Sequence, residues 1–160
     1  MSLTARLLQI YGRLPLRVRL ATVRLATPSF RVGAMCVVSR SDGALLLVRH
    51  SYRKGWGFPG GLLKRGEEPM DAAVREVEEE LGLTLDLDDV PTVVVEPNYR
   101  RVDVIYTARM PVGDGVAEPA SQTAEIVEVG WFAPGALPRL GTEATSALAE
   151  LGRAARPGSA

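Results

Sequence analysis

The segment GLLKRGEEPMDAAVREVEEELGL, residues 61–83, decides the fold because it contains a helix with clear start and stop signals. Pro69 suits the first turn of a helix, where its missing N–H would have no partner anyway. Gly82 suits the position just after the last turn, because glycine readily adopts the left-handed conformation that ends many helices. The sequence therefore predicts a helix over residues 69–81.

This predicted helix carries more negative charge than its C-terminal end favours. Ten acidic residues lie between positions 67 and 89. Four of them fall in the second half of the helix: Glu76, Glu78, Glu79 and Glu80. Because the C-terminal end of a helix is the negative end of its dipole, each such carboxylate costs about 0.3–1 kcal/mol. We expect another charge to compensate for this cluster.

The helix has two distinct faces. Its apolar stripe, expected to face a core, consists of Ala73, Val77 and Leu81. Glu76, Glu79 and Glu80 stand at positions i, i+3 and i+4, so their side chains are expected to converge on another face. Three carboxylates together suit Mg²⁺ or Mn²⁺, which prefer oxygen ligands. Charge count alone leaves a solvated acidic face as the alternative.

Composition bounds the classes of protein to consider. The chain has 160 residues, of which 46% are hydrophobic and 24% charged, and its formal net charge is zero. These values are typical of one globular domain. Zero net charge disfavours a nucleic acid partner, and no run of eighteen apolar residues predicts a membrane span. Cys36 is the single cysteine, so no internal disulfide is expected and a reducing, cytoplasmic location is favoured.

Residues 1–29 form a basic extension before the predicted domain. The first 40 residues hold seven arginines and no acidic residue. Apolar residues at helical spacing predict an amphipathic helix of two or three turns: Leu7, Leu8, Ile10, Tyr11 and Leu14. We expect this helix to be appended to the domain and packed on it. A transit peptide, or a segment that binds an anionic surface such as lipid or RNA, are the alternatives.

The rest of the chain alternates strands and turns. Residues 31–40, which include Cys36 as a small core residue, and residues 44–50 predict a hairpin. Pro59-Gly60-Gly61 is expected to break the next short strand and to open the loop before the acidic helix. The remaining predicted elements are strands at 91–96, 100–110 and 125–133 and a closing helix at 143–155.

The spacing of the charged and glycine residues forms a motif. The fixed positions are Gly61, Glu67, Arg75-Glu76-Val77, Glu79-Glu80 and Gly82-Leu83. This pattern resembles the box of the Nudix hydrolase family at every specified position, and Trp56-Gly57-Phe58-Pro59-Gly60 resembles the family's entry strand. The resemblance implies an α+β fold, a Nudix-type α/β/α sandwich with a mixed β-sheet. We expect this domain at residues 30–155, with a tail at 156–160.

The resemblance also implies a reaction. Members of the family cleave a phosphoanhydride bond in a nucleoside diphosphate linked to another moiety, using a divalent metal and water. We therefore expect a metal-dependent hydrolase that uses Mg²⁺ or Mn²⁺ and acts on a small nucleotide or nucleoside diphosphate derivative, with a homodimer left open. A non-catalytic Nudix module that senses a nucleotide is the alternative. The complete set of box glutamates favours the enzyme.

Roles for individual residues follow from the resemblance. It implies four metal ligands: Glu76, Glu79, Glu80 and the main-chain carbonyl of Gly60. It implies structural support of the site by Gly61, Glu67, Arg75 and Gly82. Within this group, Arg75 and Glu67 are expected to form an ion pair that holds the loop and the helix in place.

The base that activates water is expected among a few glutamates. In the family it is either a box glutamate or one on a later loop. Glu125, six residues before Trp131, resembles that later glutamate in placement. Glu118 and Glu128 are weaker candidates, and an ordinary carboxylate at a strand edge is the alternative for Glu125.

Substrate recognition is expected outside the box. Candidates at strand ends and loops are Arg49, Tyr52, Arg53, Trp56, Tyr99, Arg100 and Arg101. Arginine can bind phosphate with two hydrogen bonds, and aromatic rings can stack on a base. Each candidate could instead be a surface or packing residue. His50, the only histidine, is expected to be an ordinary residue at a strand end, with a phosphate contact as the alternative.

Overall fold

The computed structural model describes residues 9–110 and 118–155. The chain divides into two compact units, Met1–Phe30 and Arg31–Ala160. None of the described helices has the length and apolar character needed to cross a lipid bilayer. The predicted basic extension at residues 1–29 and the domain expected to begin near residue 30 stay a proposal.

The first unit contains a helix that the sequence reading missed. Residues 9–13 are helical, and α2 (Leu16–Ala26) follows, with none of its residues buried. Its apolar residues occur at positions 16, 18, 20, 23 and 25, a spacing that does not mark one helix face. Leu7 and Leu8 of the predicted amphipathic helix lie outside the described residues. Packing of the extension on the domain stays a prediction.

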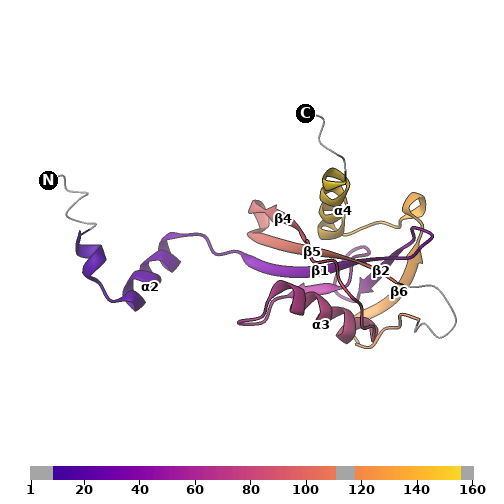
Figure 1. The fold of residues 1–160 in the computed structure, drawn as a ribbon, viewed down its shortest axis with the longest axis horizontal. Helices are drawn as coiled ribbons and strands as arrows, with labels where there is room; N and C mark the ends of the chain where they lie inside the picture. The colour runs from indigo at the N-terminus through magenta and orange to yellow at the C-terminus, as the bar shows by residue number, and fades with distance from the viewer. Residues whose placement is uncertain (1–8, 111–117, 156–160) are drawn as a thin grey trace. The chain divides into compact units, whose positions relative to one another are not determined.

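The second unit is built on one mixed sheet (Figure 1). Its strands are β1 (Arg31–Ser39), β2 (Leu45–His50), β3 (Gly60–Leu62), β4 (Thr92–Glu96), β5 (Arg101–Arg109) and β6 (Ile126–Phe132). The order is β4-β5-β1-β2-β6, and β3 pairs with β1. β1 and β5 are parallel, whereas the other pairs are antiparallel. The strands predicted at 31–40, 44–50, 91–96, 100–110 and 125–133 are confirmed.

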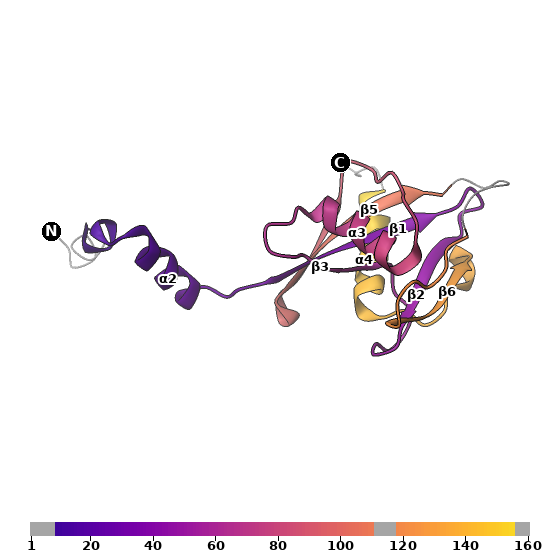
Figure 2. The same ribbon diagram turned by 90° about the horizontal axis from the view of Figure 1, so that it is seen from below.

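Two helices cover opposite faces of this sheet, as Figures 1 and 2 show. They are α3 (Pro69–Leu81) and α4 (Thr142–Ala154), and short 3₁₀ turns occupy Pro97–Tyr99 (η1) and Pro134–Ala136 (η2). Gly82 ends α3 in the left-handed conformation, at φ 67°, and its N–H donates to the Glu78 carbonyl at 2.9 Å. The predicted bounds of α3 are confirmed, and the closing helix predicted at 143–155 begins and ends one residue earlier.

Alternating residues of β1 supply both cores. Cys36 packs with Val77 and Leu81 of α3 on one face. On the other face, Met35 packs with Ala144 of α4. This alternation is the period of two expected of a strand buried on both sides. The α+β class and the α/β/α sandwich with a mixed sheet are confirmed, and Cys36 is a buried core residue as predicted.

A short segment, residues 57–62, lies between β1 and β2. The register of β1 and β2 joins Ser39 to Leu45, near their shared turn. Farther along, Gly57 pairs with Val48 of β2, and β3 pairs with residues 33–35 of β1. The strand break predicted at Pro59-Gly60-Gly61 is therefore wrong, because the glycines belong to β3, and the loop before α3 begins after Leu62. Glycine occurs both in turns and where two backbones approach closely, so the sequence alone does not distinguish these cases.

Gly60 is the point of closest approach in this inserted segment. A Cβ there would collide with the carbonyl oxygen of Ala34 and lie 2.7 Å from the Cα of Met35. Both atoms belong to the backbone of β1, so neither can move aside without distorting the strand. Gly57, in contrast, has open space where a Cβ would stand.

We expect Gly60→Ala to lower the free energy of unfolding by about 1–3 kcal/mol or more, because it overpacks a junction made of backbone. Gly57→Ala, the matched control in the same segment, should change it by less than about 1 kcal/mol. Urea denaturation followed by circular dichroism measures both. Equal stability of the two variants would contradict the close packing at Gly60.

Candidate active site

Arg75 and Glu67 form the ion pair expected from the motif. Arg75 Nε donates to Glu67 Oε1 at 2.7 Å, and its Nη2 donates to Oε2 at 3.1 Å. Glu67 also accepts a hydrogen bond from the Lys64 N–H at 2.6 Å. The paired arginine, followed by this main-chain donor, lowers the pKa of Glu67 to about 2. The loop before α3 is thus tied to the middle of the helix by a bidentate contact.

Arg75 also neutralises two carboxylates of its own helix. Its Nη1 lies 2.8 Å from Glu76 Oε1 and 3.0 Å from Glu79 Oε2. Glu79 has a second cationic neighbour, since Lys64 Nζ lies 3.4 Å from its Oε1. One guanidinium therefore compensates much of the charge that the C-terminal half of α3 collects.

Glu76 packs directly against the inserted segment. A Cβ on Gly61 would lie 2.6 Å from the carboxyl carbon of Glu76, so any larger residue would displace this carboxylate from its position. Burial raises the pKa of Glu76, although the hydrogen bond from Arg75 acts in the opposite direction. The predicted supporting position at Gly61 thus has a direct steric reason.

Glu80 is the buried member of the three box glutamates. Only 6% of Glu80 is exposed, and 3% of His50. His50 Nε2 lies 3.0 Å from Glu80 Oε1, and the Gly60 N–H donates to Glu80 Oε2 at 3.2 Å. A buried carboxylate without partners would be strongly disfavoured. The His50 imidazole and the Gly60 N–H are the partners of this carboxylate.

The three glutamates therefore run from a buried to an exposed position. Glu80 is buried, Glu76 is partly buried, and the side chain of Glu79 is 51% exposed. No three His, Cys, Asp or Glu side chains of residues 9–110 and 118–155 are grouped as a ready-made metal site. The expected convergence is not seen in this conformation, because different partners hold the carboxylates. The oxygen donors themselves still suit a hard divalent cation.

The candidates for the base lie in different surroundings. Glu125 is brought to the end of β2, where its carbonyl accepts from the Ser51 N–H at 2.8 Å and its Oε2 accepts from the Tyr52 hydroxyl at 3.4 Å. Glu128 is paired with Arg49 at 2.7 Å across β2 and β6. Glu118 is exposed. Of the three, Glu125 is the one that contacts Ser51, the residue after His50.

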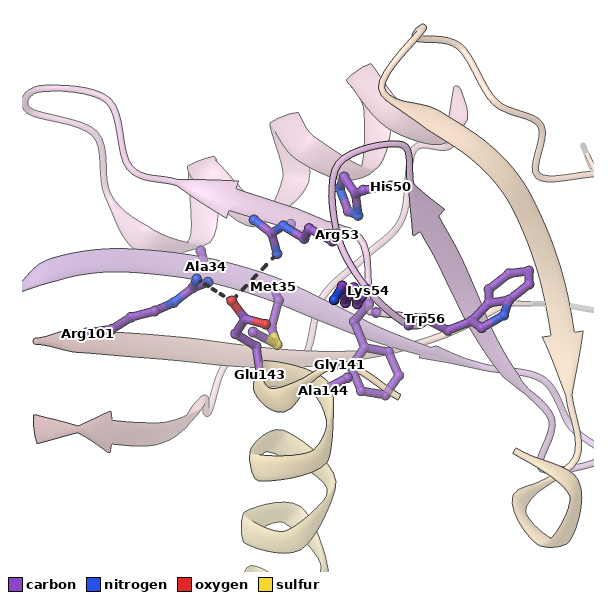
Figure 3. A pocket seen from close by; sticks show the side chains of 14 residues that line it. Ala34, Met35, His50, Arg53, Lys54, Trp56, Arg101, Gly141, Glu143 and Ala144 are labelled. Carbon is purple, nitrogen blue, oxygen red and sulfur yellow. Dashed lines mark hydrogen bonds and ion pairs between the residues drawn. The ribbon is translucent and has the colours of Figure 1, made fainter. Parts of the chain in front are cut away.

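A small cavity of about 30 Å³ adjoins the end of β2, the start of β3 and the first turn of α4 (Figure 3). Its lining includes His50 and Gly60, both partners of Glu80, and the side chains of Arg53, Lys54, Trp56, Arg101 and Glu143. Glu143, in the first turn of α4, lies 2.8 Å from Arg101 and 3.9 Å from Arg53. The cavity thus combines two arginines with one carboxylate between them.

A wider hollow of about 180 Å³ lies next to this cavity. Its lining is Arg31, Glu96, Tyr99, Arg101, Thr142 and Glu143. Arg101 and Glu143, which form an ion pair, belong to both linings. Arg101 also donates to the buried Asp103 at 2.7 Å. Burial raises the pKa of Asp103, although the hydrogen bond from Arg101 opposes this change.

The predicted substrate residues thus fall into separate groups. Arg53, Trp56 and Arg101 line the small cavity, and Tyr99 and Arg101 line the hollow. Trp56 also packs edge to face on Phe132, with ring centroids 4.8 Å apart. Arg49 lines neither space. Tyr52 and Arg100 are exposed and also belong to neither lining.

Two residues at the site were missed by sequence reasoning. His50 was expected to be an ordinary strand-end residue, yet it is buried against Glu80. Its position two residues after Val48 on the same strand was a usable signal, because alternate residues share a face. Glu143 had no sequence signal, since an acidic residue in the first turn of a helix is common.

We expect Glu67→Gln to destabilise the protein most above about pH 5 and progressively less as the pH falls towards about 2. The folded-state pKa of Glu67 is about 2, below the unfolded value of about 4.3. Its ionised form therefore stabilises the fold above the unfolded pKa, and this contribution disappears as both states become protonated. Urea unfolding of parent and variant between pH 3 and 7 measures the difference. A difference independent of pH would contradict this ion pair.

Comparison with known proteins identifies the family of the domain. Residues 29–151 match the NUDIX domain family. A MutT-like protein of Streptomyces ambofaciens is 33% identical over 107 residues, which cover 67% of this chain and 66% of that protein. An RNA pyrophosphohydrolase of Psychrobacter cryohalolentis is 39% identical over 54 residues, which cover 34% of this chain and 31% of that protein.

A solved structure has the same fold. The crystal structure of a MutT NUDIX hydrolase from Burkholderia pseudomallei matches with a TM-score of 0.64 and 28% identity, over 78% of this chain and 99% of that chain. The family match spans most of the chain, and the box lies on β3, the loop that follows it and α3. The chain therefore belongs to the Nudix hydrolase family.

Proposed function

We propose that this protein is a metal-dependent hydrolase that cleaves a phosphoanhydride bond in a nucleoside diphosphate derivative by attack of water at phosphorus. The observation that carries the proposal is the position of the box glutamates. Glu76 and Glu80 lie against adjacent residues of β3, Gly61 and Gly60, and Gly60 also lines the cavity that contains Arg53 and Arg101. Carboxylates and cationic side chains in one place suit a metal ion together with an anionic substrate.

The proposed metal ligands are Glu76, Glu79, Glu80 and the main-chain carbonyl of Gly60. When bound, Mg²⁺ or Mn²⁺ would neutralise phosphate charge and lower the pKa of a coordinated water. The acidic side of α3 would otherwise repel a diphosphate. Glu67 and Arg75 would fix the loop and the helix that carry these ligands, and Gly82 would end the helix directly after them.

Glu125 is the proposed base. Its carboxylate is exposed and accepts one long hydrogen bond from Tyr52, at 3.4 Å, so it keeps free lone pairs to accept a proton from water. Glu128 is less suited, because its hydrogen bond with Arg49 lowers its pKa. A low pKa weakens a carboxylate as a proton acceptor.

The moiety attached to the diphosphate would occupy the cavity and the adjacent hollow. A space of about 30 Å³ holds about one water molecule, so a phosphate could enter only if Glu143 moved away from Arg53 and Arg101. These arginines would then exchange one anionic partner for another. Tyr99, 62% exposed at the rim of the larger hollow, offers a face on which a base could stack.

The first test is product identification with Mg²⁺ or Mn²⁺ and a panel of nucleoside triphosphates, ADP-ribose, dinucleoside polyphosphates and nucleotide sugars. We expect at least one of them to yield a nucleoside phosphate and the phosphorylated remainder. Glu79→Gln should lower kcat by about a hundredfold or more, since loss of a metal ligand removes several kcal/mol of transition-state stabilisation. Glu78→Gln, the same change at the neighbouring exposed position, should leave kcat within about threefold.

Binding of a nucleotide without turnover, seen as a raised melting temperature with no product, would instead support the sensing module. Equal rates for parent and Glu79→Gln would remove Glu79 from the ligand set.

We expect Arg53→Gln to raise KM for the active substrate about tenfold while kcat changes little, because a contact made equally in the ground and transition states affects mainly KM. Arg53 is a better probe than Arg101, whose removal would also leave the buried Asp103 without its partner. Arg109→Gln, an exposed position at the far end of β5, serves as the control. An unchanged KM would place the substrate away from this cavity.

A further inference from the structure

We propose that His50 is a positioning residue that fixes the carboxylate of Glu80 for metal binding. This inference rests on the proposed function, because it gives His50 a task only if Glu80 is a metal ligand. The contact joins the end of β2 to the last turn of α3, and no part of the box motif includes His50.

The fold directs His50 towards α3. Leu46 and Val48 of β2 pack in the core cluster that also contains Val77 and Leu81 of α3. His50 follows these residues at the period of a strand, so its side chain emerges on the same face. The register of β2 and β6 shifts beside it, between Arg49 and His50, and an irregularity of this kind commonly redirects the side chains around a site.

The two oxygens of Glu80 are each held by a separate donor. Because an ionised carboxylate can only accept hydrogen bonds, His50 Nε2 must carry the hydrogen that points to Oε1, at 3.0 Å. The Gly60 N–H holds Oε2 at 3.2 Å. Two donors on different elements fix both the position and the plane of the group. Each oxygen retains a lone pair with which it can bind a cation.

Glu80 differs in this respect from its two neighbours in the box. Glu76 and Glu79 are both paired with the guanidinium of Arg75, which must release or share them when a metal binds. The partners found for Glu80 are an imidazole N–H and a main-chain N–H, neither of which needs to leave. Glu80 is therefore prearranged as a ligand, and His50 supplies half of that arrangement. Groups of this kind typically change metal affinity by about 10–100-fold.

The test compares His50→Gln with His50→Asn. The amide nitrogen of Gln can reach the position of Nε2, whereas that of Asn stands nearer the position of Nδ1 and falls short of Glu80. Both variants are polar and uncharged, so they differ mainly in reach. The measurement is the Mn²⁺ dissociation constant of each protein without substrate, obtained by titration with detection of free Mn²⁺ by electron paramagnetic resonance.

We expect the Gln variant to bind Mn²⁺ within about threefold of the parent and the Asn variant to bind about tenfold or more weakly. Equal affinity of the two variants, whether both strong or both weak, would overturn the positioning role. A parent protein that binds no Mn²⁺ would overturn the proposed function itself, which separates the two failures. If the Asn variant does not fold, His50→Leu replaces it, since leucine fills a similar volume without a donor.

Discussion

The structure depends on the close approach of three backbones where residues 57–62 lie between β1 and β2. Gly57 pairs with β2, and Gly60–Leu62 pair with β1. A side chain at Gly60 would strike the backbone of β1, and one at Gly61 would strike the carboxylate of Glu76. Two glycines therefore make the sheet continuous and at the same time bring β3 to the acidic side of α3. The small cavity beside Gly60 lies at this junction.

The electrostatics of α3 follow from the same arrangement. The C-terminal half of the helix is unfavourably acidic by itself, and Arg75 offsets part of that charge by contacting Glu67, Glu76 and Glu79. Glu80 is compensated differently, because it is buried and bonded to His50 and Gly60. The site thus separates carboxylates held by a guanidinium from one held by an imidazole and a main-chain N–H. The three glutamates therefore stand in unequal surroundings despite their shared motif.

Much of the fold was readable because its signals are local. Pro69 and Gly82 fix the ends of α3 through backbone chemistry within a few residues, and the alternation in β1 follows from burial on both faces. The strand break predicted at Pro59-Gly60-Gly61 was wrong because glycine serves both turns and close strand contacts. α2 was missed because its apolar residues do not gather on one face.

The sequence by itself determined the acidic helix and its capping, since both depend on residues within one segment. Its motif also indicated membership of the family, and the resemblance implied the pairing of Arg75 with Glu67. Only the tertiary structure decided that Glu80 is buried against His50, that Glu143 lies between Arg53 and Arg101, and that Arg49 lines neither hollow. These contacts join residues 30 to 90 positions apart in the chain. Their distances depend on how strands and helices pack, which no local pattern records.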